Sequence, residues 1–147
     1  MFVKNEVLEQ MKSRRSVRRY KSDMVPEELI EAVVTAGTEA GPGMNRQTPV
    51  VIAVTNKEIR DRLSAVNAEI AGRGNSDPFY GAPVVLAVVA RKEGTYIYDG
   101  SLTMGNMLLA AHSLGLGACW IHRAQQTFER PEWIKWLKSL GLEGEYE

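Results

Sequence analysis

The sequence is poor in the residues that build metal centres and disulfide frameworks. It has one cysteine, Cys119, and two histidines, His112 and His122, in 147 residues. One cysteine excludes an internal disulfide and a cysteine-based metal cluster, and two histidines are too few for a multi-histidine metal site. The sequence therefore predicts no bound metal, and a lone thiol suits the reducing cytoplasm.

An excess of charge of one sign and long apolar runs are also missing. Lys plus Arg and Asp plus Glu number 18 each, so the net charge gives no reason to expect nucleic acid or an anionic membrane surface as a partner. The longest strongly apolar stretch, residues 82–90, is far shorter than the roughly 20 residues of a membrane span. The first ten residues lack the apolar core of a signal peptide. We therefore expect a cytoplasmic protein that has neither a nucleic-acid nor a membrane partner.

The residues that are present predict a globular protein. Apolar residues make up 44% of the chain and charged residues 24%, and the length suits a single domain over residues 1–147. Apolar spacing and helix-start residues predict helices over 4–13, from Pro26 to Gly37, over 57–70, over 100–114 behind an Asp99 N-cap, and from Pro131 to Gly141. Short apolar runs predict strands over 49–55, 82–90 and 118–121.

These elements predict a layered α/β or α+β domain with a small sheet. The helix over 100–114 is apolar on most faces and should lie at the centre of the fold. Because three short strands cannot cover such a helix, we expect a second copy of the chain to supply part of the core.

The first candidate site is a basic segment. Residues 12–21 hold six basic residues and no acidic one. A solvated surface patch is the ordinary interpretation of such a run. The alternative is a phosphate site, because the guanidinium groups of Arg14, Arg15 and Arg18 match phosphate oxygens and Ser16 adds a hydroxyl donor.

Two further segments could hold a ligand. In residues 41–49, Gly and Pro fit simple turns, but Asn45 and Gln47 could also present amide groups to a planar heterocycle. Residues 115–122 contain no dinucleotide-binding glycine motif. There we expect Cys119 to be buried and inert, and His122 to be a surface or hydrogen-bonded histidine.

Few side chains are arranged for catalysis on their own. His112 fits a structural role within its helix, and Asp99 fits an N-cap better than a general base. No catalytic triad or carboxylate pair is apparent in the sequence. An enzyme with this composition would therefore depend on a cofactor that the protein binds and orients.

Taken in order, these segments resemble the FMN-dependent nitroreductase family. The family's Arg-[Arg/His]-Ser-x-[Arg/Lys] motif is matched by residues 14–18, its Val-Pro helix start by residues 25–26, and its Ala-Pro-Ser-x-x-Asn-x-Gln-Pro loop, loosely, by residues 41–49. Its Ala-Pro-Val strand, Asp-led apolar helix and Leu-Gly-Leu-Gly-x-Cys-Trp-Ile strand are matched by residues 82–84, 99–111 and 114–121. The resemblance implies an α+β, nitroreductase-like fold: a small mixed β-sheet flanked by helices around a central apolar helix, in a dimer.

The resemblance also implies a role for each matched residue. Arg14, Arg15 and Ser16 would bind the phosphate and ribityl chain of FMN, and Arg18 the pyrimidine edge of the flavin. The second loop would reach the flavin of the partner subunit. Its contacting residues would be Pro42, Gly43, Met44, Asn45 and Gln47. The flavin ring would lie along Trp120, Ile121 and His122, with a backbone N–H near N5.

The implied activity is a two-step, ping-pong transfer of hydride from NAD(P)H through the flavin to a nitroaromatic, a quinone or a similar acceptor. FMN would lie at the interface of a homodimer, and no protein side chain would act as the catalyst. The sequence departs from the family at Gly43, where serine is usual. The family also continues past the position of Glu147 into a further strand and a basic segment. A non-catalytic dimeric module that binds a flavin or another phosphorylated ligand is therefore the alternative function.

Overall fold

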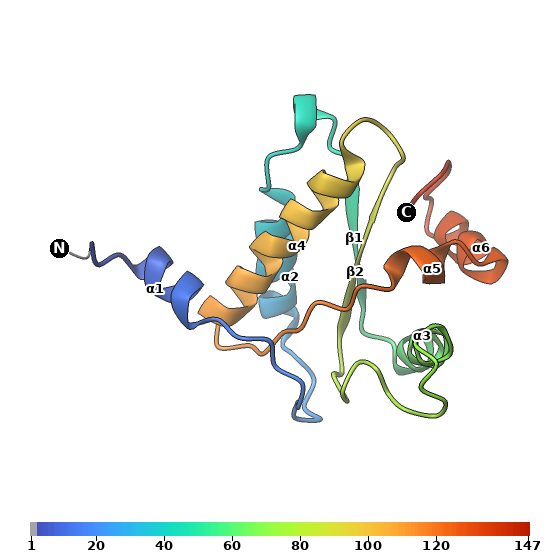
Figure 1. The fold of residues 1–147 in the computed structure, drawn as a ribbon, viewed down its shortest axis with the longest axis horizontal. Helices are drawn as coiled ribbons and strands as arrows, with labels where there is room; N and C mark the ends of the chain where they lie inside the picture. The colour runs from blue at the N-terminus through green and yellow to red at the C-terminus, as the bar shows by residue number, and fades with distance from the viewer. Residues whose placement is uncertain (1–2) are drawn as a thin grey trace.

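The computed structural model describes residues 3–147, so residues 1 and 2 of the expected domain lie outside the described residues. Helices and strands alternate along most of the chain (Figure 1). The helices are α1 (Glu6–Ser13), α2 (Glu27–Thr38), α3 (Lys57–Ile70), α4 (Tyr96–Ser113), α5 (Ala124–Phe128) and α6 (Pro131–Ser139), with one 3₁₀ turn, η1 (Gly43–Asn45). The strands are β1 (Pro49–Val54) and β2 (Val85–Ala90).

The two strands form an antiparallel pair with helices on both faces. The register places Val51 opposite Val88 and Ile52 opposite Ala87. Because successive side chains of a strand point to opposite faces, Val51 and Val88 pack with α2 and α4. Ile52 and Ala87 pack into a second core with α3, α5 and α6. The α+β class is therefore confirmed (Figure 1).

The sheet is narrower than the sequence predicts. The strand expected over 118–121 is wrong, because that segment makes one isolated parallel bridge, between Ala118 and Ser16. At the end of β2, Tyr146 bridges Arg91, and Ala90 and Glu147 exchange backbone hydrogen bonds of 2.8 and 3.0 Å. In the described part of the chain, β2 therefore has β1 as its only full partner strand.

The start of α4 also differs from expectation. The helix begins at Tyr96, so Asp99 lies within its first turn and is not its N-cap. The capping prediction fails because residues 96–98 are already helical, and the Asp99 carboxylate turns instead toward Thr95 and a distant loop. None of the helices in residues 3–147 is long and apolar enough to cross a bilayer.

Helix α1 stands away from the rest of the fold (Figure 1). The Asn5 side chain caps its N-terminus by accepting from the backbone N–H groups of Val7 and Leu8. No residue of α1 is buried, and the expected apolar face of Val7, Leu8 and Met11 is 50–57% exposed. Within one chain, this face has no core to pack into.

One carboxylate fixes the loop that joins α3 to β2. Asp77 accepts hydrogen bonds from Arg60 and Ser64 of α3 and from the backbone N–H groups of Phe79 and Gly81. Burial alone would raise the pKa of Asp77, but the hydrogen bonds lower the pKa by more than burial raises it. The resulting pKa is about 2. The charged carboxylate is therefore the form that holds the loop.

This carboxylate makes the stability of the fold depend on pH. The folded-state pKa of Asp77 lies below its unfolded value of about 3.9, so its stabilisation is present above pH ~4 and is lost as the pH falls toward about 2. We expect Asp77→Asn to lower the free energy of unfolding at pH 7 by about 1–3 kcal/mol. Urea titrations should show that the difference in unfolding free energy between this variant and wild type becomes smaller below pH 4.

Glu93→Gln is the matched control, because Glu93 forms an exposed pair with Arg91 away from Asp77 and Arg60. Exposed pairs of this kind contribute about 0–1 kcal/mol. An Asp77→Asn protein as stable as the wild type at every pH would contradict this role.

Candidate functional site

Two of the three segments predicted to form the site lie side by side. The backbone N–H of Val17 donates to the carbonyl of Ala118 at 3.0 Å, beside the bridge between Ser16 and Ala118. Gly117 permits this approach, because a Cβ at that position would lie 3.0 Å from Val17 Cγ1. The basic segment 14–18 therefore runs next to residues 118–122.

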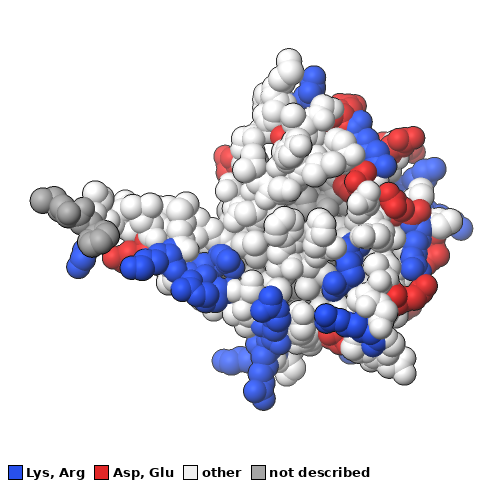
Figure 2. All heavy atoms as spheres, viewed as in Figure 1, with Lys and Arg blue, Asp and Glu red and all other residues white. Residues whose placement is uncertain are grey.

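The cations of the basic segment form one surface patch. Figure 2 shows Lys and Arg side chains gathered below α1 and along the segment after it. Every ion pair recorded for residues 3–147 joins charged residues outside 12–21. Over the same described residues, the structure gives the guanidinium groups of Arg14 and Arg18 no hydrogen bond. These two side chains are available to an anion.

Arg15 differs from its neighbours. Its guanidinium donates to the carbonyls of Lys12 and Arg14 at 2.7 and 2.8 Å and so caps the C-terminus of α1. On the other side of the motif, the Tyr20 hydroxyl donates to the Val17 carbonyl. Burial, followed by the nearby Cys119 thiol, raises the pKa of Tyr20 to about 12, so this hydroxyl stays protonated. Both contacts shape the backbone that carries Arg14 and Arg18.

His112 connects this segment to α4. Its Nε2 lies 2.9 Å from Ser13 Oγ, immediately before the basic motif. His112 belongs to the last turn of α4. The C-terminal end of α4 therefore fixes the place where the basic motif begins.

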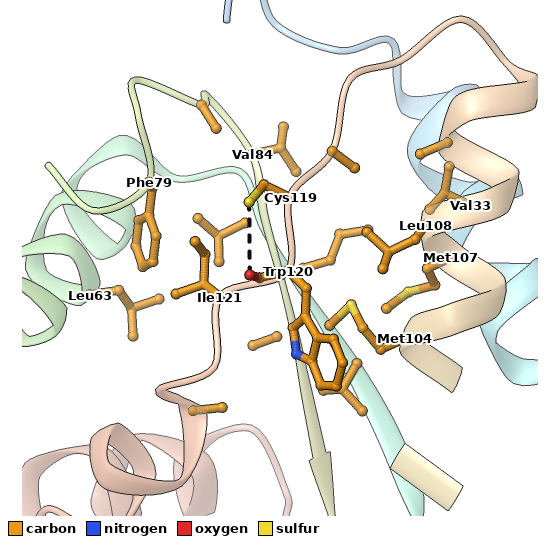
Figure 3. A pocket seen from close by; sticks show the side chains of 18 of the residues that line it. Val33, Leu63, Phe79, Val84, Met104, Met107, Leu108, Cys119, Trp120 and Ile121 are labelled. Atoms are coloured by element: carbon orange, nitrogen blue, oxygen red, sulfur yellow. Dashed lines mark hydrogen bonds between the residues drawn. The ribbon is translucent and has the colours of Figure 1, made fainter. Parts of the chain in front are cut away.

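A cavity of about 890 Å³ opens beside residues 118–122. Its walls come from β2, α4, residues 79–84 and residues 115–122, and most of the labelled side chains are apolar, among them Phe79, Met104 and Leu108 (Figure 3). Three predicted residues line it: Trp120, Ile121 and His122. The Trp120 side chain is half exposed and meets the His122 ring edge-on, with the ring centroids 5.8 Å apart.

Contrary to expectation, Cys119 is not fully buried. It is half-buried on the cavity wall, with its Sγ 3.8 Å from the Trp120 carbonyl oxygen (Figure 3). The apolar sequence around Cys119 suggested a strand packed in the core. In the structure this segment lines an open cavity instead. His122 is exposed, as predicted.

The third predicted segment lies at the other end of α4. The backbone N–H of Gly43 donates to Asp99 Oδ1 at 2.9 Å, in the first turn of that helix. At 1.5 Å per residue, Asp99 and His112 are about 20 Å apart along the helix axis. Within one chain, the structure therefore does not bring the loop to the basic motif (Figure 1).

The loop itself has an unusual backbone. Met44, Asn45 and Gln47 all have positive φ angles, of 53°, 53° and 52°. The Met44 side chain is 84% exposed, and Gln47 Nε2 donates to Asn45 Oδ1 at 3.2 Å. The loop therefore presents its side chains outward, away from its own chain's core.

Some of the residues that shape this region could not be predicted easily from the sequence. The cavity walls include Tyr20 and Phe79, which lie in segments read as a basic run and a polar loop. Their aromatic side chains amid polar neighbours were the available signal. The loop contact of Asp99 had no such signal, because an acid before an apolar helix fits an N-cap equally well.

Comparison with known proteins extends this description. Residues 11–146 match the model of the Nitroreductase family. A Methanothermobacter thermautotrophicus protein, provisionally named NADH dehydrogenase/NAD(P)H nitroreductase, is 38% identical over an alignment of 128 residues that covers 80% of this chain and 61% of that protein. FMN reductase [NAD(P)H] of Bacillus subtilis is 28% identical over 77% of this chain and 52% of its own length. The chain thus spans about half to three fifths of these two relatives.

Solved structures agree with the fold. The nitroreductase with bound FMN from Bacteroides fragilis has a TM-score of 0.84 at 33% identity, over 98% of this chain and 84% of that one. The nitroreductase with bound FMN from Desulfitobacterium hafniense has a TM-score of 0.86 at 28% identity, over 99% and 85%. The match over residues 11–146, together with these structures, shows that the chain belongs to the nitroreductase family.

Proposed function

We propose that this protein binds FMN and acts as an NAD(P)H-dependent oxidoreductase of the nitroreductase type. The observation that carries the proposal is the pairing of the basic segment with residues 118–122: Ser16 bridges Ala118, and Val17 lines the same cavity as Trp120. The FMN-bound relatives and the relative named FMN reductase support this choice of ligand. The half-buried Cys119 suits a reducing, cytoplasmic setting.

The residues present fit FMN in charge and in shape. A phosphate dianion needs cationic donors, and Arg14, Arg15 and the Ser16 hydroxyl are the donors of the exposed motif. Arg15 would give up or share its contacts with the α1 carbonyls to take part. The flavin ring would lie along Trp120, Ile121 and His122, where an aromatic side chain is already half exposed.

When bound, FMN would accept a hydride from NAD(P)H and pass it on to an electron-poor acceptor such as a nitroaromatic or a quinone. The chain's own residues would bind and orient it. Arg18 would bring a fixed positive charge to the pyrimidine edge, where the reduced ring carries negative charge. The described residues need supply no acid or base for this transfer.

The complete site would need a second copy of the chain. The loop over 42–47 lies about 20 Å along α4 from the basic motif, so it would reach a flavin bound there most directly from a partner subunit. The apolar surface that such a partner would cover is present on α1 and α4. Its half-exposed or more exposed residues are Val7, Leu8, Met11, Ile97, Tyr98 and Leu102.

The binding site can be tested through Arg14 and Arg18, two guanidinium groups of the motif to which the described residues give no hydrogen bond or ion pair. We expect Arg14→Ala and Arg18→Ala each to weaken FMN binding, measured by quenching of flavin fluorescence. Loss of a charged hydrogen bond costs about 1–3 kcal/mol, which corresponds to roughly a 5- to 150-fold weaker affinity. Lys135→Ala is the matched control, because it removes an exposed cation from α6. Unchanged affinity in both arginine variants would contradict the assignment.

The dimer can be tested through the exposed face of α1. Light scattering after size exclusion should give twice the chain mass of 16.3 kDa. Leu8→Asp and Met11→Asp should shift it toward the monomer, because each places a charge in the proposed apolar interface. Ile134→Asp, on the exposed side of α6, should leave the dimer intact. A wild-type protein that is monomeric at micromolar concentration would contradict the proposed dimer.

A further inference from the structure

We infer that Asp99 is a positioning residue that holds the loop over 42–47 in the conformation in which it reaches the flavin of a partner subunit. The inference rests on the proposed function and concerns the geometry of that same site. It begins with a buried charge that is not needed to start α4.

Asp99 is only 4% exposed, and both of its carboxylate oxygens have partners. Oδ1 accepts from the Gly43 N–H at 2.9 Å, and the Thr95 hydroxyl lies 3.1 Å from each oxygen. The positive end of the α4 dipole further stabilises the charge in this first turn. The helix thus presents a fixed acceptor to a loop that lies 56 residues away in sequence.

Close packing between the loop and the helix depends on glycine at position 43. A Cβ there would lie 2.0 Å from Thr95 Oγ1 and 3.2 Å from Thr95 Cβ. The Thr95 hydroxyl thus lies where a side chain at position 43 would begin. Gly43, which departs from the family pattern, lets the loop backbone come within hydrogen-bond distance of Asp99.

The residues after Gly43 need such an anchor. Met44, Asn45 and Gln47 have left-handed backbone angles, which residues other than glycine hold only where their surroundings impose them. Among the described residues, the bond from the Gly43 N–H to Asp99 is the only hydrogen bond that joins positions 42–47 to the rest of the chain. Without Asp99, the Gly43 N–H would lose its acceptor and the turn would lose the hydrogen bond that joins it to α4.

The loop then has a defined direction. Met44 is 84% exposed at its tip, and Asn45 is held by the Gln47 side chain. These are side chains assigned to the flavin of the second subunit. Asp99 would therefore act on that flavin through the loop, without touching it.

The first test compares FMN affinity in Asp99→Ala, Asp99→Asn and wild type. Asp99→Ala should weaken binding about 10-fold or more. Asp99→Asn keeps an oxygen that can accept from Gly43 N–H, so its loss should be smaller. Leu137→Val is the control for lost stability, because it trims a buried side chain of α6; it should leave the affinity unchanged. If Asp99→Ala does not fold, Asp99→Asn and Thr95→Val carry the same comparison.

A mixed dimer provides a readout that a merely structural role would not change. Asp99→Ala is co-expressed with the Arg14→Ala/Arg18→Ala double variant. In each mixed dimer, one site combines an intact basic motif with an intact loop, and the other site has neither. Random pairing in a two-fold dimer makes about a quarter of all sites intact. We expect that fraction to bind FMN with wild-type affinity.

The outcomes separate the two proposals. If wild type binds FMN and Asp99→Ala binds it equally well, or if no mixed-dimer sites recover, the positioning role is overturned while the proposed function stands. If wild type binds no FMN, both are overturned. Faster hydrogen exchange of the Gly43 amide in Asp99→Ala, measured without FMN, would show the loss of the anchor directly.

Discussion

The site depends on one rigid helix that carries an anchor at each end. Helix α4 has 18 residues, which at 1.5 Å per residue span about 27 Å. His112 near its C-terminus contacts Ser13, beside the basic motif, and Asp99 near its N-terminus holds Gly43. Because α4 is one continuous helix, the two segments stay at its opposite ends. This separation dictates what one chain can and cannot assemble.

The consequence is visible in the packing of the chain. The buried face of α4 meets α2 and the sheet, but Ile97, Tyr98 and Leu102 remain more than half exposed, and the apolar face of α1 is at least half exposed. Exposed apolar surface of this extent is typical of protein–protein interfaces. A symmetric partner would cover it and would also bring the loop of one chain toward the basic motif of the other. Stability and ligand binding would then depend on the same contact.

Local sequence patterns predicted the elements where local forces decide the structure. The helix over Lys57–Ile70 matches its predicted bounds, because apolar spacing and the Asn56 cap agree with the tertiary packing. The bounds of β1 differ by one residue. The pairing of residues 14–18 with 118–122 could not be read from composition, since it depends on Gly117 allowing Val17 to approach. Only the ordered set of family motifs indicated that these segments share a site.

Other features depend on contacts between residues far apart in sequence. Asp99 has the sequence context of an N-cap, and only the tertiary position of Gly43 gives it another role. The segment over 118–121 is apolar enough for a strand, but a strand needs a neighbour to pair with, and this segment makes only one bridge. The short helix α5 was missed because five residues give too little periodicity to detect.

The most direct test of the central claim is the visible absorption spectrum of the purified protein after FMN is added and the excess removed. The spectrum is then followed while NADH or NADPH is added without oxygen. We predict that the protein retains a flavin spectrum, and that this spectrum bleaches on addition of one or both nucleotides. A protein that retains no flavin would contradict the assignment of the site, and a retained flavin that neither nucleotide reduces would contradict the oxidoreductase activity.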